Sequence, residues 1–217
     1  MIFIEHNRKI KLNIKTINNR GTNEKVLLPR WEWRSFVDKF DEFRNFIAAK
    51  PLGNKKFDVD MYLIGKLDNY NVKIRNNAID VKELKEIDAT GLEKWTPILK
   101  VKFPLQYSEV ALICKYLGVL NICLKQKKYA KDEFFKVLFH TENTVDHVKV
   151  EKERKIYVVD NCIIEFTKAY INKVRYNTVC IESEKPFNVL ALRDKMQLPI
   201  DKNENYVYGL KRIIAKI

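Results

Sequence analysis

A short stretch near residue 30 alternates charged and aromatic residues, and this pattern constrains the fold. The stretch reads Arg30-Trp31-Glu32-Trp33-Arg34. Successive side chains of a β-strand point to opposite faces, so the three charged residues share one face and the two tryptophans share the other. A charged strand face ordinarily points to solvent, but several later segments carry the same kind of face. This repetition favours strands whose charged faces line one cavity.

The same alternation returns around a pair of asparagines. Asn76-Asn77 predicts a tight turn, because asparagine tolerates positive φ, and the short segments on either side alternate apolar and charged residues. The result is a predicted β-hairpin. Its first strand has Lys73 and Arg75 on one face, and its second strand has Asp80 and Lys82 on one face.

The rest of the chain predicts a mixture of strands and helices. Apolar residues alternate in some segments and recur at helical spacing in others. We expect an N-terminal extension over residues 1–27, with an edge strand as one option there, and a single domain over residues 28–217. Further strands are predicted over 56–66, 98–103, 148–157, 162–167 and 174–184, helices over 37–49, 108–117, 131–139 and 188–196, and a basic tail that contains Tyr206, Gly209 and Lys211.

The composition indicates a globular protein that binds an anion. The chain has 217 residues, 46% of them hydrophobic, and a formal net charge of +13. This charge implies an anionic partner, whether nucleic acid, a membrane surface or a polyanionic small molecule. The apolar N-terminus is too short for a signal peptide, and no apolar run approaches the roughly 18 residues of a membrane span. We therefore expect a cytoplasmic protein that is not embedded in a membrane.

The cysteines and histidines do not predict a metal site. Cys114, Cys123, Cys162 and Cys180 show no Cys-x-x-Cys spacing, and most lie among apolar neighbours. Free thiols in a reducing compartment are therefore favoured over a zinc site or disulfides. The three histidines form no ligand pair at helical or strand spacing.

Charged faces from several strands would create an electrostatic problem if they shared one interior. An excess of buried positive charge costs several kcal/mol per unpaired charge, or lowers lysine pKa values. A bound polyphosphate removes this excess, and Mg²⁺ or Mn²⁺ commonly bridges carboxylates and phosphate. The predicted phosphate-binding residues are Arg30, Arg34, Lys73, Arg75, Lys82, Lys100, Lys102, Lys152 and Arg154, and the predicted metal-binding residues are Glu32, Glu165, Glu182 and Glu184. Cations at one end and carboxylates at the other would orient the phosphate chain.

The order of these charged strands resembles the CYTH superfamily, the triphosphate tunnel metalloenzymes. The resemblance covers about residues 28–214 and implies an α+β fold, an eight-stranded antiparallel β-barrel or tunnel with helices packed outside. It also implies that Glu32 belongs to the opening acidic motif of the family and that Glu165 belongs to a later acidic strand. In the same way, Lys73, Arg75, Lys152 and Arg154 would bind phosphates, and Glu182 and Glu184 would bind the metal.

Two positions depart from the pattern of the family. Arg30 stands where the family has its first glutamate, and Thr167 stands where a second acidic residue is usual. Arg34 replaces a lysine, which keeps the charge. The first two changes weaken the expected metal site.

The leading hypothesis is a metal-dependent phosphohydrolase that acts on a triphosphate, inorganic or attached to an organic group, with Mg²⁺ or Mn²⁺. Such a reaction needs positioning, charge neutralisation and a water molecule, but no covalent nucleophile. The alternative is a binding module. It would be a catalytically silent protein that binds polyphosphate or a nucleotide, or a basic protein that binds nucleic acid.

Overall fold

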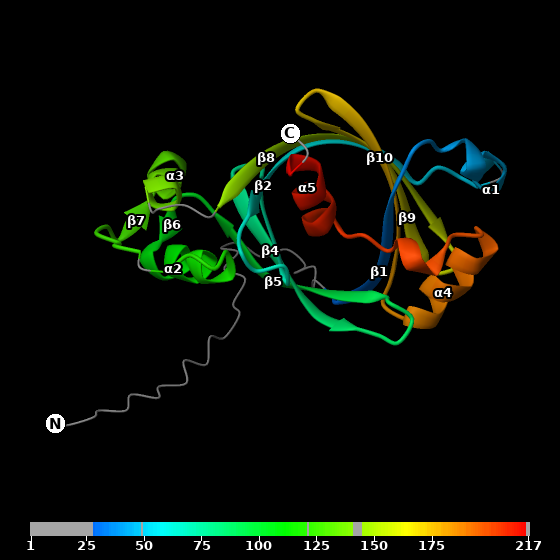
Figure 1. Cartoon of the computed structure of the whole chain (residues 1–217), viewed down its shortest axis with the longest axis horizontal. Coiled ribbons are helices and arrows are strands. Elements are labelled where there is room, and N and C mark those ends of the chain that lie inside the picture. The colour runs from blue at the N-terminus through cyan, green and yellow to red at the C-terminus, as the bar shows by residue number, and fades with distance from the viewer. Residues whose placement is uncertain (1–27, 49, 121, 141–144, 216–217) are drawn as a thin grey trace, which may run out of the picture.

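Eight strands of the computed structural model form one closed barrel (Figure 1). The model describes residues 28–48, 50–120, 122–140 and 145–215. The predicted extension over residues 1–27 lies outside these residues. The order around the barrel is β1-β10-β9-β8-β2-β3-β4-β5, and every neighbouring pair is antiparallel. The strands are β1 (Arg30–Val37), β2 (Asn54–Ile64), β3 (Tyr70–Arg75), β4 (Ala78–Ile87), β5 (Glu93–Lys102), β8 (Asp146–Val159), β9 (Cys162–Ile171) and β10 (Val174–Ser183).

Tight turns and one short contact complete the barrel. Asn76 and Asn77 have φ angles of 47° and 58°, which confirms the predicted hairpin turn between β3 and β4. The barrel closes where β1 meets β5, over only three residue pairs from Arg30–Trp95 to Glu32–Glu93. Beyond Glu32 the two strands separate. Residues 203 and 204 fill the gap, because the Arg34 amide donates to Asn203 Oδ1 at 2.8 Å and the Glu204 amide donates to the Arg34 carbonyl at 2.6 Å.

Helices cover the outer face of the barrel, as predicted. Trp31 and Trp33 lie on that face, in an apolar cluster with residues of α4. A second cluster joins the outer faces of β3 and β4 to α2 and α3. The helices are α1 (Arg44–Ala48), α2 (Tyr107–Tyr116), α3 (Lys131–His140), α4 (Pro186–Lys195) and α5 (Tyr206–Ile214), and the shorter elements are η1 (Asp41–Phe43), η2 (Ile200–Lys202) and the strand pair β6 (Leu105–Gln106) and β7 (Lys128–Tyr129). No described helix is long and apolar enough to cross a membrane.

Several element boundaries differ from the sequence predictions. The helix predicted over 37–49 is mostly absent, because β1 extends to Val37 and only α1 and η1 follow. Helix α2 begins at Tyr107, one residue before the predicted start at 108, because the Glu109 side chain accepts from the Gln106 amide at 2.6 Å and caps the first turn there. The strand predicted over 98–103 begins five residues earlier, since β5 starts at Glu93.

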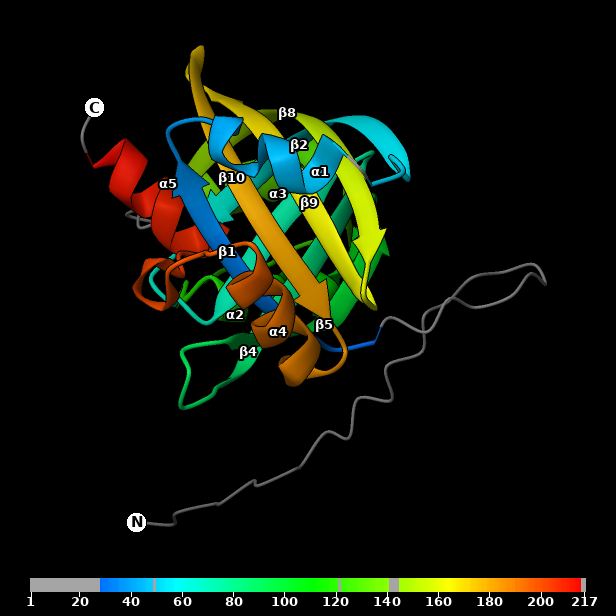
Figure 2. The same ribbon diagram turned by 90° about the vertical axis from the view of Figure 1, so that its right-hand side faces the viewer.

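Helix α5 closes one end of the barrel. This segment is not the basic tail that was predicted, because Leu210 and Ile213 are buried against inner-face residues at the ends of β2, β8 and β9. Figure 1 shows the helix within the ring of strands, and Figure 2 shows it at one end. The Asn205 side chain caps α5 by accepting from the Tyr208 amide at 3.1 Å. The cavity inside the barrel therefore opens at the opposite end.

The packing of α5 predicts a large effect of one core substitution. Leu210→Ala removes a fully buried side chain from the plug and should lower the free energy of unfolding by about 2–5 kcal/mol. The matched control is Tyr208→Ala on the same helix, where the side chain is exposed and the change should stay within about 0.5 kcal/mol. Urea unfolding followed by tryptophan fluorescence measures both. Equal effects of the two substitutions would contradict a packed α5.

Candidate functional site

A charged cavity of about 210 Å³ lies inside the barrel. Its walls are the inner faces of the strands, where alternation places the charged residues. In the described part of the chain, seven cationic side chains and four carboxylates line this cavity. They are Arg34, Lys73, Arg75, Lys82, Lys100, Lys152 and Arg154, with Glu32, Asp80, Glu165 and Glu182.

Asp60 on β2 holds two of these cations. It is fully buried, and Arg75 donates to both of its carboxylate oxygens, at 2.5 and 2.6 Å. Lys152 Nζ donates to Asp60 Oδ2 at 2.8 Å and to the Tyr62 hydroxyl at 2.6 Å. Burial by itself raises the pKa of Asp60, but the hydrogen bonds from Arg75 and the charge of Lys152 outweigh it and hold the pKa well below its usual range. Asp60 is therefore ionised and joins β2, β3 and β8.

The remaining arginines of the cavity also have carboxylate partners. Arg154 binds Asp58, and its NH1 donates to Glu165 Oε2 at 2.9 Å. Arg34 Nε donates to Glu32 Oε1 at 2.8 Å, and its NH1 lies 3.7 Å from Glu165 Oε1. Burial raises the pKa of Glu165, but the charges of Arg34 and Arg154 outweigh this effect and lower the pKa to about 2. These guanidinium groups are thus fixed in position before any ligand arrives.

Lys73 and Lys82 differ from the arginines of the cavity in their contacts. Among the described residues, neither lysine has a hydrogen bond or an ion pair, although both line the cavity. Burial, helped by the charge of Arg75, lowers the pKa of Lys73 to about 8. Burial also acts to lower the pKa of Lys82, but the charges of Glu182 and Glu32 raise it overall. These two ammonium groups are the cations of the cavity most available to an external anion.

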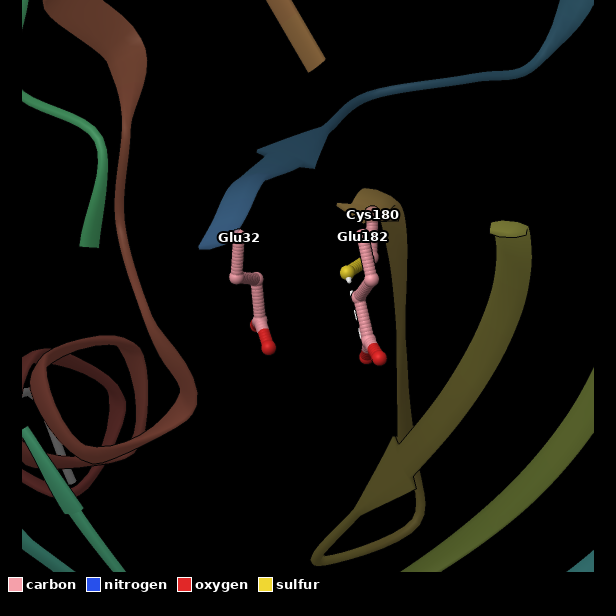
Figure 3. Close-up of side chains that lie close together, drawn as sticks. All are labelled: Glu32, Cys180 and Glu182. Atoms are coloured by element: carbon pink, nitrogen blue, oxygen red, sulfur yellow. Dashed lines mark hydrogen bonds between the residues drawn. The ribbon is translucent and has the colours of Figure 1, made fainter. Parts of the chain in front are cut away.

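A group of possible metal ligands joins β1 and β10 (Figure 3). One ligand atom each from Glu32, Cys180 and Glu182 lies within 4.8 Å of the others. The two glutamates are cross-strand partners. Burial holds the pKa of the Cys180 thiol well above its usual value, so the thiol is neutral. Carboxylate oxygens suit a hard cation such as Mg²⁺ or Mn²⁺, whereas a neutral thiol does not, so the residues fit such a cation through the two glutamates.

Both carboxylates of this group already contact an arginine. Arg34 donates to Glu32, and Arg30 NH1 donates to Glu182 Oε2 at 3.2 Å. A bound cation would therefore share the carboxylates with these guanidinium groups. Its other ligands would have to come from phosphate oxygens and water.

Most of the predicted site residues line the cavity, but three do not. Arg30 lies at its open end, where its side chain is 40% exposed. Lys102 is exposed and is not among the lining residues. Glu184 follows the end of β10 and is also exposed, so the residue that shares the inner face of β10 with Glu182 is Cys180. The buried Thr167 donates to Glu165 Oε1 at 2.9 Å.

The acidic face of β2 was not among the predicted parts of the site. Asp58 and Asp60 alternate with apolar residues ahead of Tyr62, which is the same signal that identified the other strands. Together with the buried Glu93, which accepts from the cavity-lining Asn205, they change the charge balance of the described interior to seven cations against seven carboxyl groups. Cations and carboxylates also alternate throughout the network, so the expected separation into a cationic end and an acidic end is wrong.

The barrel confirms the fold that the resemblance to the CYTH superfamily implies, with eight antiparallel strands around a charged interior. No model of a known protein family matches the sequence, and no curated protein is significantly similar to it.

Several solved structures are similar to the barrel. A conserved hypothetical protein from Pyrococcus furiosus is 14% identical, with a TM-score of 0.48 over 82% of this chain and 98% of that chain. A protein from Pyrococcus horikoshii is 17% identical, with a TM-score of 0.46 over 82% and 96%. The Hippeastrum protein HpAC1, described as having a dominant triphosphatase activity, is 8% identical, with a TM-score of 0.47 over 78% and 89%.

The ion pairs of Asp60 predict a strong effect on stability. Asp60→Asn leaves the buried Lys152 without its ion-pair partner and leaves Arg75 only its longer contact with Asp58 at 3.8 Å, so it should lower the free energy of unfolding by about 3–5 kcal/mol. The control is Asp80→Asn, because the partner of Asp80 is the half-exposed Lys100, 3.5 Å away, and such a pair contributes at most about 1 kcal/mol. Denaturant unfolding measures both. A loss below about 1 kcal/mol in Asp60→Asn would show that the network does not hold the strands together.

Proposed function

We propose that the protein hydrolyses a triphosphate, inorganic or attached to an organic group, that binds inside the barrel with Mg²⁺ or Mn²⁺. Lys73 and Lys82, which have no ion pair with any residue that the structure describes, lie in the same cavity as the carboxylates of Glu32 and Glu182, and this observation carries the proposal. A phosphate chain supplies the negative charge that the lysines lack. Because the charges face inward, a ligand small enough to enter the barrel is favoured over a nucleic-acid backbone.

The charge balance supports a requirement for a divalent cation. Seven cations against seven carboxyl groups leave little excess positive charge among the described interior groups. A triphosphate carries several negative charges, so its binding needs further positive charge. A divalent cation at Glu32 and Glu182 would supply it and would polarise a phosphoryl oxygen or an attacking water.

Side chains of the protein would position the phosphates. Lys73 and Lys82 would contact phosphate oxygens directly. Arg75 and Arg154, already held by Asp60, Asp58 and Glu165, would present their remaining N–H groups without the entropic cost of ordering a free side chain. Such preorganised cations stabilise charge that develops during phosphoryl transfer.

A binding function without turnover has its own supporting observation. Arg30 contacts Glu182, and the neutral Cys180 occupies the inner-face position next to it on β10. Both features reduce the negative charge available to a metal. A protein with this site would bind a triphosphate and release it unchanged.

Phosphate release tests the catalytic proposal directly. Tripolyphosphate, ATP and thiamine triphosphate are incubated with the protein and with Mg²⁺ or Mn²⁺. We expect metal-dependent release that falls on the order of 100-fold in Glu32→Gln/Glu182→Gln, because the carboxylates that hold the cation are gone. Glu184→Gln is the matched control and should leave tripolyphosphate turnover unchanged, since its carboxylate lies outside the cavity. An inactive parent that binds tripolyphosphate tightly, and loses binding in Lys73→Ala/Lys82→Ala, would establish the binding function instead.

The lowered pKa of Lys73 predicts a pH dependence of binding. With a pKa of about 8, the Lys73 ammonium loses its proton as the pH rises through 8, so tripolyphosphate affinity should fall between pH 7 and pH 9. One proton accounts for at most about tenfold per pH unit. Lys73→Arg keeps its charge over this range and should bind with a smaller fall. Titration calorimetry without metal measures both proteins, and identical pH profiles would contradict the role of Lys73.

A further inference from the structure

A groove of about 610 Å³ lies on the outer face of the barrel. We name it the outer groove. Strands β2, β8 and β9 contribute its floor, and α1 lies over this side of the barrel (Figure 2). Phe40, just before η1, packs on Phe166 of β9 with ring centroids 5.4 Å apart. Because Phe166 belongs to the apolar cluster with Trp31 and Trp33, the groove lies outside the barrel wall.

The strand faces that form the outer groove are opposite to those that line the inner cavity. Lys55 and Phe57 line the groove, whereas Asp58 on the same strand contacts the interior cation Arg154. Lys155 follows Arg154 on β8 and therefore points to the other face. A ligand can thus reach the outer groove without entering the barrel.

Apolar side chains form most of the body of the outer groove. Phe40 and Ile47 approach from the side of η1 and α1, and Phe166 approaches from β9. Phe57 on β2 completes this apolar surface and is 65% exposed, so the protein itself does not cover it. Such a surface favours a ligand with an apolar chain or ring.

Positive charge surrounds this apolar surface. Lys55 and Lys155 are cross-strand partners, and the next pair, Lys56 with Arg154, also joins two cations. Like charges directly opposite each other on neighbouring strands are destabilising. Within the described part of the chain, none of these three lysines has an ion pair, and five cations line the groove against two carboxylates. An anionic group between Lys55 and Lys155 would relieve their repulsion.

The volume of the outer groove indicates the size of its ligand. Small-molecule sites usually measure about 300–1,000 Å³ and are mostly apolar, with a few polar groups that fix the orientation of the ligand. The outer groove, at about 610 Å³, falls within this range, whereas the inner cavity, at about 210 Å³, does not. The two spaces therefore suit ligands of different chemistry.

We infer that the outer groove binds a small amphipathic anion, an organic carboxylate with an apolar body. The apolar body would lie against Phe40, Phe57 and Phe166, and the carboxylate would lie between Lys55 and Lys155. This site is additional to the proposed phosphate site, and its occupation does not depend on the proposed function.

Binding of three matched small molecules tests the inference. Titration calorimetry uses dodecanoate below its micelle-forming concentration, dodecylammonium with the same chain and the opposite charge, and acetate with the carboxylate alone. We expect one dodecanoate to bind per chain and neither of the other two to bind measurably. Lys55→Gln/Lys155→Gln should weaken dodecanoate binding about tenfold through the loss of charge-assisted contacts. Phe57→Ala should weaken it about fivefold through the loss of apolar contact.

Two variants outside the outer groove provide matched controls. Lys125→Gln/Lys127→Gln removes the same charge from two exposed lysines between α2 and α3. Phe187→Ala removes a phenylalanine that is 61% exposed, close to the value for Phe57. Both should leave the dodecanoate affinity unchanged. A thermal melt of each variant shows whether a change in binding reflects loss of folded protein.

Several results would overturn the inference. One is a parent protein that does not bind dodecanoate, and another is equal affinity in the parent and in Lys55→Gln/Lys155→Gln. Loss of dodecanoate binding in Lys73→Ala/Lys82→Ala would place the ligand in the inner cavity instead. If a polyglutamate peptide binds through Lys55 and Lys155 while dodecanoate does not, the outer groove binds an acidic protein segment. Tripolyphosphate hydrolysis is measured separately, so its absence would contradict only the proposed function.

Discussion

The ion pairs of Asp60 with Arg75 and Lys152 are the interaction on which the rest of the structure depends. A barrel lined with cations would be unstable alone, because each unpaired buried charge costs several kcal/mol. Carboxylates on β2 offset this cost from within the chain, since Asp58 and Asp60 contact three of the cations. The same pairing allows the cavity to form before any ligand is bound. It also leaves little excess positive charge for a polyanionic ligand, which is the basis of the proposal that a divalent cation binds with it.

Local patterns in the sequence were enough to predict the strand faces and one turn. Alternation from Arg30 to Arg34 and the Asn76-Asn77 pair involve interactions between near neighbours, so no tertiary information is needed. Closure into a barrel entered through the resemblance to a family. The role of Asp60 was not predicted, although its alternation is visible, because only the register of β2 against β8 and β3 brings it to Lys152 and Arg75.

Other features of the site depended on where elements end. Glu184 was predicted to act with Glu182, but β10 stops at Ser183, so the partner on the inner face is Cys180. Helix α5 was not predicted, because basic residues such as Lys211 and Arg212 interrupt its apolar residues in the sequence. Its apolar face can be recognised only from the structure, which shows the end of the barrel against which the helix packs. The plug that α5 forms also closes the inner cavity on one side, where Asn205 and Tyr206 line it.

The pairing of β1 has a consequence for how the chain folds. β1 pairs with β10 over seven residues, but with β5 over only three, and its partners in β10 are about 140 to 150 residues away in the sequence. Such distant contacts close large loops and make folding slow. During synthesis, β1 emerges long before β10, with its tryptophans and one backbone edge uncovered. A β-strand in this state is prone to aggregation, so the order of synthesis makes the early chain dependent on protection until its last strand arrives.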